Sequence, residues 1–245
     1  LGYEVVVPPQ AMLGDRDNLG DPEALWSWVE ANCQDVQAAV ISSDSMIYGS
    51  LVGSRKHSYA AADVKARAER FNAFRAAHPT LKLYVFGSIM RTPSCGANAG
   101  SEEPDYYMAY GDKIFRYTGL GDKAEMTGLT PAEKAEQAAL EKAIPAEYLQ
   151  DWLGRRVKNY AANKVLIDAA KSGAFDYLIL GKDDNAPLSQ THRESRELKA
   201  YSEGLPESKF QAMTGIDEMG MLLLTRAVNE MTHNAPLVCV EYNQG

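Results

Sequence analysis

The sequence has little cysteine, no long apolar run and no extended basic cluster. Its three cysteines, Cys33, Cys95 and Cys239, are too few and too widely spaced for a disulfide framework or a zinc motif. No apolar run approaches the roughly 20 residues of a membrane span. The formal net charge is −8 and no basic run extends beyond residues 54–57, so neither nucleic acid nor an anionic membrane is an expected partner. These absences favour a small molecule, a carbohydrate or a protein as the partner.

Several motifs that are typical of a particular cofactor or reaction are also missing. The chain has no Gly-x-Gly-x-x-Gly after a strand, no phosphate-binding Walker loop, no Gly-x-Ser-x-Gly elbow and no His-Glu-x-x-His. The sequence therefore predicts no cofactor. The four histidines are dispersed, and His192 is the one we consider as a metal ligand or acid. Composition leaves the cellular compartment and the oligomeric state open.

What is present is the alternation of strands and helices that defines an α/β domain. Hydrophobic residues make up 45% of the chain, enough for a sizeable core. Alternating strands and helices imply parallel strands with helices covering the sheet, either in a doubly wound sheet or in part of a (β/α)8-type barrel. Short apolar runs predict buried strands at 3–7, 38–42, 81–86, 177–180 and 237–242.

Helix signals lie between these runs. Asp21 followed by Pro22 predicts a helix start, with Leu25, Trp28 and Val29 facing the sheet. Further helices are expected at 60–77, after a capping box at Thr130, after Pro145, and at about 193–201 and 218–231. Residues 91–122 show no regular period, which is typical of a functional loop or lid.

Residues 1–245 are therefore expected to form a single α/β domain with a helical insertion at about 95–172. The chain begins at Leu1, without a start methionine, and ends in a strand that no covering helix follows. From these two features we expect a fragment of a longer protein, with sequence missing on both sides.

Polar residues follow the predicted strands, where parallel sheets bind their ligands. The most informative are Asp183 and Asp184, two adjacent carboxylates that leave a buried strand. Repulsion between them raises the pKa of one member, and a protonated and an ionised carboxyl together serve general acid/base chemistry. The alternative is a turn in which Asp183 or Asn185 caps the following helix.

The other candidates carry alternatives as well. Asp44 either belongs to the site or forms an Asx-turn or helix cap, and Arg91 either clamps a substrate or pairs with an acidic neighbour. We interpret Arg55 as a solvated loop residue. Glu218 lies in the first turn of a helix that Asp217 would cap, which competes with a role in the site. Glu241 alternates with Val240 on a strand, so it is able to face a polar cavity.

The strand-end segments resemble the successive motifs of one bacterial family, known as domain of unknown function 4127. The resemblance covers essentially the whole chain and implies a shared site that includes Asp44, Tyr48, Arg91, Asp183, Asp184 and Glu218. Members of the family are longer at both ends, and the resemblance implies no reaction. The segments are Asp44-Ser45-Met46-Ile47-Tyr48-Gly49, Ile89-Met90-Arg91-Thr92-Pro93, Glu103-Pro104-Asp105-Tyr106, Asp183-Asp184-Asn185-Ala186-Pro187 with Arg193-Glu194, and Gly215-Ile216-Asp217-Glu218.

Three functions are consistent with these residues. The first is a hydrolase acting on a glycoside or related carbohydrate, with catalytic Asp183 and Asp184. The second is metal-assisted hydrolysis, with Asp44, Asp183, Asp184 and His192 as ligands. The third is a protein that binds a small polar ligand or sugar without turnover. For the first, we expect the substrate to be bound by Asp44, Tyr48, Arg91, Asn185, Glu218 and Glu241, near a lid that carries Tyr106, Tyr107, Tyr110 and Tyr117.

Overall fold

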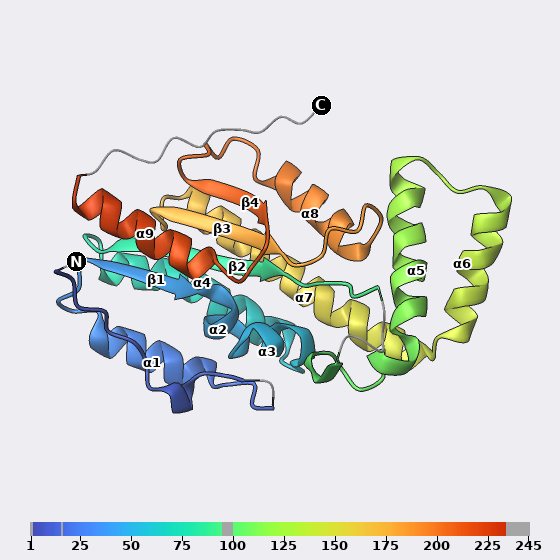
Figure 1. Cartoon of the computed structure of the whole chain (residues 1–245), viewed down its shortest axis with the longest axis horizontal. Coiled ribbons are helices and arrows are strands. Elements are labelled where there is room, and N and C mark those ends of the chain that lie inside the picture. The colour runs from blue at the N-terminus through green and yellow to red at the C-terminus, as the bar shows by residue number, and fades with distance from the viewer. Residues whose placement is uncertain (1, 16, 95–99, 234–245) are drawn as a thin grey trace.

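A computed structural model of the chain describes residues 2–15, 17–94 and 100–233 (Figure 1). Its centre is a parallel sheet in the order β1 (Ala38–Ser42), β2 (Lys82–Ile89), β3 (Tyr177–Lys182), β4 (Phe210–Thr214). Within the described residues the sheet is open, with β1 and β4 at its edges. The prediction of parallel strands alternating with helices is therefore confirmed, and the open sheet, not the barrel, is the form observed.

Helices cover both faces of this sheet. On one face, strand side chains such as Leu83 and Leu178 pack in a core with α4 (Ala61–Ala77) and α7 (Ala146–Lys171). On the other face, Tyr84 and its neighbours pack against α9 (Met219–Met231). Burial on both sides explains why β2 and β3 are continuous apolar runs, without the alternation of a half-exposed strand.

The helix that precedes the sheet, α1 (Pro22–Asn32), begins as predicted. The Asp21 side chain accepts hydrogen bonds from two backbone amides of the first turn. Leu25 and Val29 are buried as expected, but Trp28 is only partly buried. The fully buried residue is Trp26, whose indole N–H donates to the Met46 carbonyl at 3.0 Å. The short 3-10 helix Gln10–Met12 precedes α1 in the chain.

The insertion is more helical than the sequence indicated. After the 3-10 helix Gly100–Glu102 come α5 (Tyr107–Met126) and α6 (Pro131–Ala143), which pair as a hairpin beside the sheet (Figure 1). Thr130 and Glu133 form the predicted capping box. The prediction of an irregular segment is wrong from residue 107 onward, because the glycines of α5 obscure its helical period. One of them, Gly119, permits close packing, since an added Cβ would lie 2.9 Å from the Leu188 carbonyl oxygen.

Two strand predictions also fail or fall outside the described chain. Residues 3–7 form no strand, and the side chains of Val5, Val6 and Val7 are exposed, because no neighbouring strand pairs with them among the described residues. The segment 237–242, with Glu241, lies outside the described residues. Conversely, β4 was missed because only Phe210 of its five residues is buried.

The remaining helices connect consecutive strands of the sheet. They are α2 (Ser43–Tyr48) and α3 (Leu51–Lys56) after β1, and α8 (Gln190–Tyr201) between β3 and β4. None of the helices in the described residues has the length and apolar character needed to cross a membrane.

Candidate functional site

The carboxyl ends of β1 and β2 bring Asp44 and Ser88 together. Asp44 lies in the first turn of α2, directly after β1, and is only 5% exposed. Its Oδ2 accepts a hydrogen bond from the Ser88 backbone N–H at 2.9 Å. Burial raises the pKa of Asp44 to about 7, although hydrogen bonding from Ser88 and the charge of Arg55 act in the opposite direction. The neutral carboxylic acid form of Asp44 is therefore favoured far more than in an exposed aspartate.

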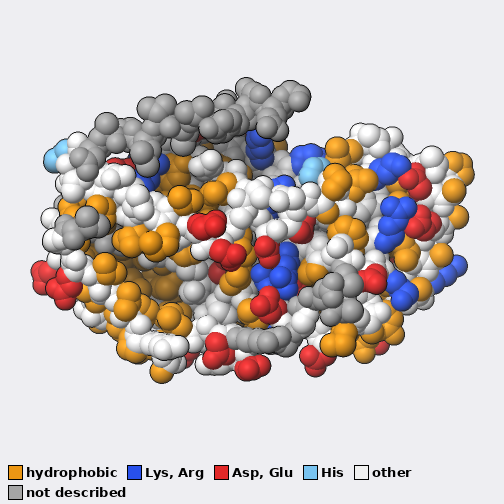
Figure 2. All heavy atoms as spheres, viewed as in Figure 1, with side chains coloured by type: hydrophobic (Ala, Val, Ile, Leu, Met, Phe, Trp, Pro, Cys, Tyr) orange, Lys and Arg blue, Asp and Glu red, His pale blue; other side chains and the backbone are white. Residues whose placement is uncertain are grey.

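Beside Asp44, two arginines and three carboxylates form a compact cluster, here called the arginine cluster. Arg55 contacts Glu102 at 2.8 Å (Nη1–Oε2) and Asp183 at 3.6 Å (Nη2–Oδ2). Arg91 contacts Glu103 at 2.8 Å (Nε–Oε1), Glu102 at 3.1 Å (Nη2–Oε2) and Asp183 at 3.5 Å (Nη1–Oδ2). Figure 2 shows acidic and basic side chains gathered near the middle of the visible face, over the arrowhead ends of the strands.

Burial sets the protonation behaviour of this cluster. The Arg55 side chain is 3% exposed, so the interpretation of Arg55 as a solvated loop residue is wrong. Its burial lowers the pKa of the guanidinium, and the charge of Arg91 lowers it further. Burial likewise raises the pKa of Glu103, against the hydrogen bond from Arg91. The Oε2 atom of Glu103 is buried and has no hydrogen-bond partner among the described residues.

Asp183 and Asp184 are adjacent in sequence but have different partners. Asp183 contacts the two arginines, and its side chain is 37% exposed. Asp184 instead accepts from the Thr92 backbone N–H at 2.7 Å and from the Ser189 hydroxyl at 3.4 Å. Ser189 is also the residue that caps α8, so the alternative in which Asp183 or Asn185 caps that helix is wrong. Their joint action in catalysis stays a prediction.

Tyr48 lies behind Asp44, away from solvent. It is 3% exposed, and its ring stacks on that of His57 with centroids 4.9 Å apart. Burial, and then the charge of Asp44, raises the pKa of Tyr48 well above its ordinary value. A tyrosine in this position supports the wall of the site and does not present its ring to solvent.

The last predicted residues lie toward β4. The Asn185 side-chain oxygen accepts from the Thr214 hydroxyl at 3.1 Å, which ties the β3 loop to the end of β4. Glu218 is exposed and occupies the N-cap position of α9 without forming a side-chain cap. The prediction that Asp217 caps this helix is therefore wrong. Glu241 cannot be placed, because it lies outside the described residues.

His192 belongs to a different contact, between α5 and α8. Its Nδ1 lies 2.6 Å from Oδ2 of Asp122, whose side chain is fully buried. Arg196 also contacts Asp122, at 3.1 Å. Within the described part of the chain, no three His, Cys, Asp or Glu side chains are grouped so as to hold a metal ion.

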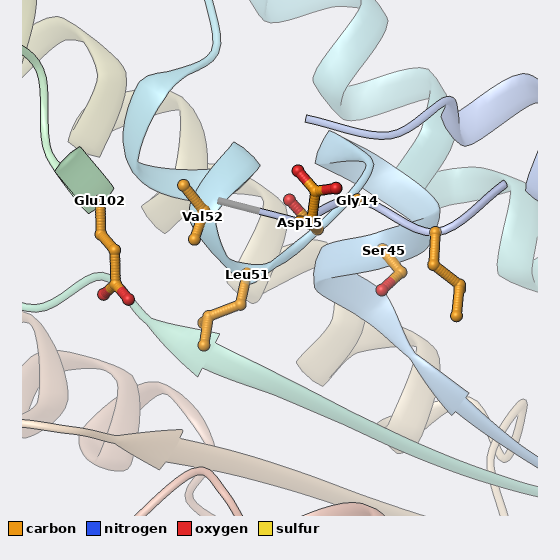
Figure 3. Close-up of a pocket in the computed structure, with 8 residues that line it drawn as sticks. Gly14, Asp15, Ser45, Leu51, Val52 and Glu102 are labelled. Carbon is orange, nitrogen blue, oxygen red and sulfur yellow. The ribbon is translucent and has the colours of Figure 1, made fainter. Parts of the chain in front are cut away.

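A pocket of ≈ 370 Å³ opens next to the arginine cluster. Figure 3 shows Glu102 on one side of it, Asp15 and Ser45 on the other, and Leu51 between them. Ser45 directly follows Asp44, and Glu102 is one of the acids that contact both arginines. The pocket is therefore lined by the sequence neighbour of Asp44 and by one carboxylate of the arginine cluster, whereas Asp44 and Asp183 themselves do not line it. Its lining residues are Leu13, Gly14, Asp15, Ser45, Ser50, Leu51, Val52 and Glu102.

Close backbone contacts hold the wall of the pocket that contains Gly14. An added Cβ at Gly14 would lie 2.6 Å from the Leu19 carbonyl oxygen. Gly49 has a φ of +95°, and its added Cβ would lie 2.2 Å from the same oxygen. Only glycine permits this approach, so Gly14 and Leu19 lie close against the turn between α2 and α3.

Sequence reasoning missed part of this site. Glu102 and Asp15 were not singled out, and Arg55 was placed in solvent. Glu103 opens one of the segments that carry the family resemblance, which was a usable signal. The acidic residues of the loop before α1 gave no comparable signal, because their position depends on how that loop packs.

The fold and this cluster define an α/β domain with a charged pocket at the carboxyl edge of a parallel sheet. The chain belongs to the family described as protein of unknown function (DUF4127), whose model matches residues 1–245. No match was found among curated proteins or among solved structures.

Proposed function

We propose that the protein is a hydrolase acting on a glycoside or related carbohydrate, with Asp44 as the proton donor and Asp183 as the second carboxyl group. The observation that carries this proposal is the environment of Asp44. A buried carboxyl whose pKa rises to about 7 is able to donate a proton at neutral pH, which an ordinary aspartate is not.

Glycoside hydrolysis divides the work between two carboxyl groups. One protonates the glycosidic oxygen as its bond to the anomeric carbon breaks, and the other assists the attack on that carbon. In the proposal, the Asp44 proton passes to the leaving oxygen. Asp183 is the more exposed of the two, and either takes the proton of the attacking water or bonds to the anomeric carbon before water releases it.

Arg55 links these two groups. It forms an ion pair with Asp183 and its charge also acts on Asp44. A buried guanidinium between two carboxyls holds them in different electrostatic environments, which is the condition for one to act as acid and the other as base or nucleophile.

The pocket has the size and lining that a small sugar needs. Its ≈ 370 Å³ falls at the lower end of the range for small-molecule sites, roughly 300 to 1,000 Å³. The lining combines apolar Leu51 and Val52 with the hydroxyls of Ser45 and Ser50, so it offers both apolar contact and hydrogen bonds.

Other residues of the predicted site have supporting roles in this proposal. Asp184 holds the backbone at Thr92, directly after Arg91, and so fixes where the arginine leaves β2. Tyr48 backs Asp44, and Arg91 orients Asp183. Asn185 and Glu218 lie farther toward β4, where an extended substrate would reach.

The experiment is a screen of aryl glycosides with the full-length protein at about pH 5 and pH 7, followed by two variants. Asp44→Asn and Asp183→Asn are each expected to lower kcat by at least about a hundredfold, as removal of a general acid or base does. Asp63→Asn, an exposed residue on α4, serves as the matched control and keeps full activity.

Two outcomes would contradict the proposal. The first is the absence of turnover for every glycoside, with binding of free sugars intact, which would identify a binding protein. The second is turnover that neither variant diminishes, which would place the chemistry elsewhere in the protein.

A further inference from the structure

We propose that residues 237–242 of this chain complete the sheet by adding to the open edge of β1 as a further parallel strand. These residues lie outside the described part of the chain, and their apolar, β-branched sequence predicts a buried strand. The inference does not depend on the proposed function. It is drawn from the edge that β1 presents, from the path of α9 and from the length of chain that joins the two.

β1 has the sequence of an interior strand. Among the described strands it lies at the edge of the sheet, yet Ala38–Ser42 contains no charged residue and no proline, which natural edge strands use to prevent further pairing. On its inner side, the Gln37 carbonyl accepts from the Lys82 backbone N–H at 3.1 Å. Because alternate residues of a strand direct their backbone groups to opposite sides, Ala38 and Val40 direct theirs to the open edge. A strand on that side would satisfy these N–H and C=O groups.

The path of α9 leads toward this edge. α9 follows β4, at the opposite edge of the sheet, but it packs against β1 and β2, and Ala38 and Val40 contact the cluster that contains Leu223 of α9. It lies on the other face of the sheet from α4 and α7, which connect the earlier strands. Crossovers between parallel strands are right-handed, so helices on opposite faces carry the chain in opposite directions along the sheet. The strand after α9 is therefore expected beyond β1.

α9 also ends at the level where a parallel strand must begin. The hydroxyl of Tyr84, near the start of β2, donates to Glu230 Oε2 at 2.6 Å, and His233 lines a small pocket together with Lys82. Figure 1 shows this end of α9 on the side of the sheet where β1 begins. The four residues from His233 to position 237 span up to about 13 Å. A strand beyond β1 lies two strand spacings, about 10 Å, from β2, so the link is long enough.

The other apolar segment that was predicted as a strand, residues 3–7, does not occupy this edge. The structure describes these residues, and Val5, Val6 and Val7 are exposed. The edge of β1 therefore remains open although this segment is present. The alternative occupant is a second copy of the chain, which the experiment below distinguishes.

The added strand would reach the candidate site. A parallel strand in this position ends at the same edge of the sheet as β1, and Asp44 lies directly after β1. The end of the added strand carries Glu241, which is thereby brought toward Asp44. The predicted role of Glu241 in the site depends on this pairing.

Disulfide trapping in the full chain tests the pairing. With Cys33→Ala and Cys95→Ala, Cys239 is the one native thiol that remains, and Ala39→Cys or Val40→Cys adds a second thiol on either face of β1. Adjacent strands lie about 4.8 Å apart, within the Cα separation of about 4.4 to 6.8 Å that a disulfide requires. Under mild oxidation, at least one of the two variants should form the disulfide within one chain at least about tenfold more than the control Ala212→Cys, which lies exposed on β4 at the opposite edge.

Hydrogen exchange of the unmodified chain gives a second measurement that needs no variant to fold. Peptides that cover 38–42 and 237–242 should be protected at least about a hundredfold, whereas residues 3–7 should exchange almost as fast as an unfolded chain. Exchange in 237–242 as fast as in 3–7, or a cross-link to position 212, would overturn the proposal. So would protection of 237–242 without a cross-link to β1, which would place the strand elsewhere. Disulfide-linked dimers as the only product would refute pairing within one chain and identify a second copy as the occupant.

Discussion

Replacement of Glu194 by alanine tests the contact that holds the end of β2 in place. Glu194 forms a buried bidentate pair with Arg156, at 2.8 Å to Nε and 2.7 Å to Nη2. Arg156 is 1% exposed and also donates to the carbonyl oxygens of Arg91 at 2.9 Å and Met90 at 2.7 Å. The pair therefore fixes the backbone from which Arg91 enters the arginine cluster.

The magnitude follows from what the substitution leaves behind. Removal of one partner of a buried ion pair leaves an uncompensated charge and costs about 3 to 5 kcal/mol. Glu194→Ala should therefore lower the free energy of unfolding by that amount. Arg156→Met should cost a comparable amount, and it also leaves the Arg91 carbonyl without that donor, worth about 1 to 3 kcal/mol.

The double variant separates charge from hydrogen bonding. With Arg156→Met and Glu194→Ala together, no buried charge is left unpaired, so the loss should be well below the sum of the single losses, by about 2 kcal/mol or more. Unfolding in urea followed by circular dichroism measures all three values, with Glu197→Ala, at a partly exposed pair with Arg193, as the control. A loss below about 1 kcal/mol for Glu194→Ala would refute the reasoning.

Three further perturbations have defined outcomes. Because burial raises the pKa of Asp44 to about 7, the folded state holds a proton that the unfolded state releases, so the contribution of Asp44 to stability falls as pH rises from about 4 to 7. Burial lowers the pKa of His57 to about 4, so the contribution of His57 to stability rises with pH up to about 6.5. In Asp44→Asn the opposing contribution of Asp44 is absent, and unfolding experiments should show stability that rises with pH over this range. Gly49→Ala should cost at least about 2 kcal/mol in chemical denaturation, and more than Gly128→Ala, which has a similar positive φ but nothing within 4 Å of an added Cβ. Asp21→Ala removes a helix cap and should cost about 1 kcal/mol, measured as a lower melting temperature.

The fold was predictable where local signals and burial agree. Residues 38–42 form a strand with the predicted bounds, because an apolar β-branched run between two helix signals has few alternatives. The cap at Thr130 is likewise decided by side chains within three residues of one another. In both cases the interactions that determine the structure join residues close together in the sequence.

The secondary-structure predictions failed where residues distant in the sequence determine the structure. Residues 3–7 have the composition of a strand but no neighbour in the described chain, and β4 has a weak composition but pairs with β3 in register. The pairing of backbones, not the local sequence, determines both outcomes. The helix α5 was missed because its glycines lower the local propensity, which tertiary contacts overcome.

The same distinction explains what the sequence revealed of the site. Parallel pairing aligns Ile89 with Lys182, so the residues just after β2 must lie beside those just after β3. That rule places Arg91 near Asp183, and the structure shows them in contact. The rule needs the order of the strands in the sheet, which the structure supplies.

Adjacency in the sequence predicted the contacts of the site residues less well than the alignment of the strand ends. Two residues that are adjacent in a loop need not face the same partners. Asp183 turns to the arginines, and Asp184 turns to the amide of Thr92. The acid that burial perturbs most is Asp44, from a different strand end, and no pattern within its own segment encodes that burial. Carboxyl groups with different roles are therefore better sought at neighbouring strand ends than side by side in the sequence.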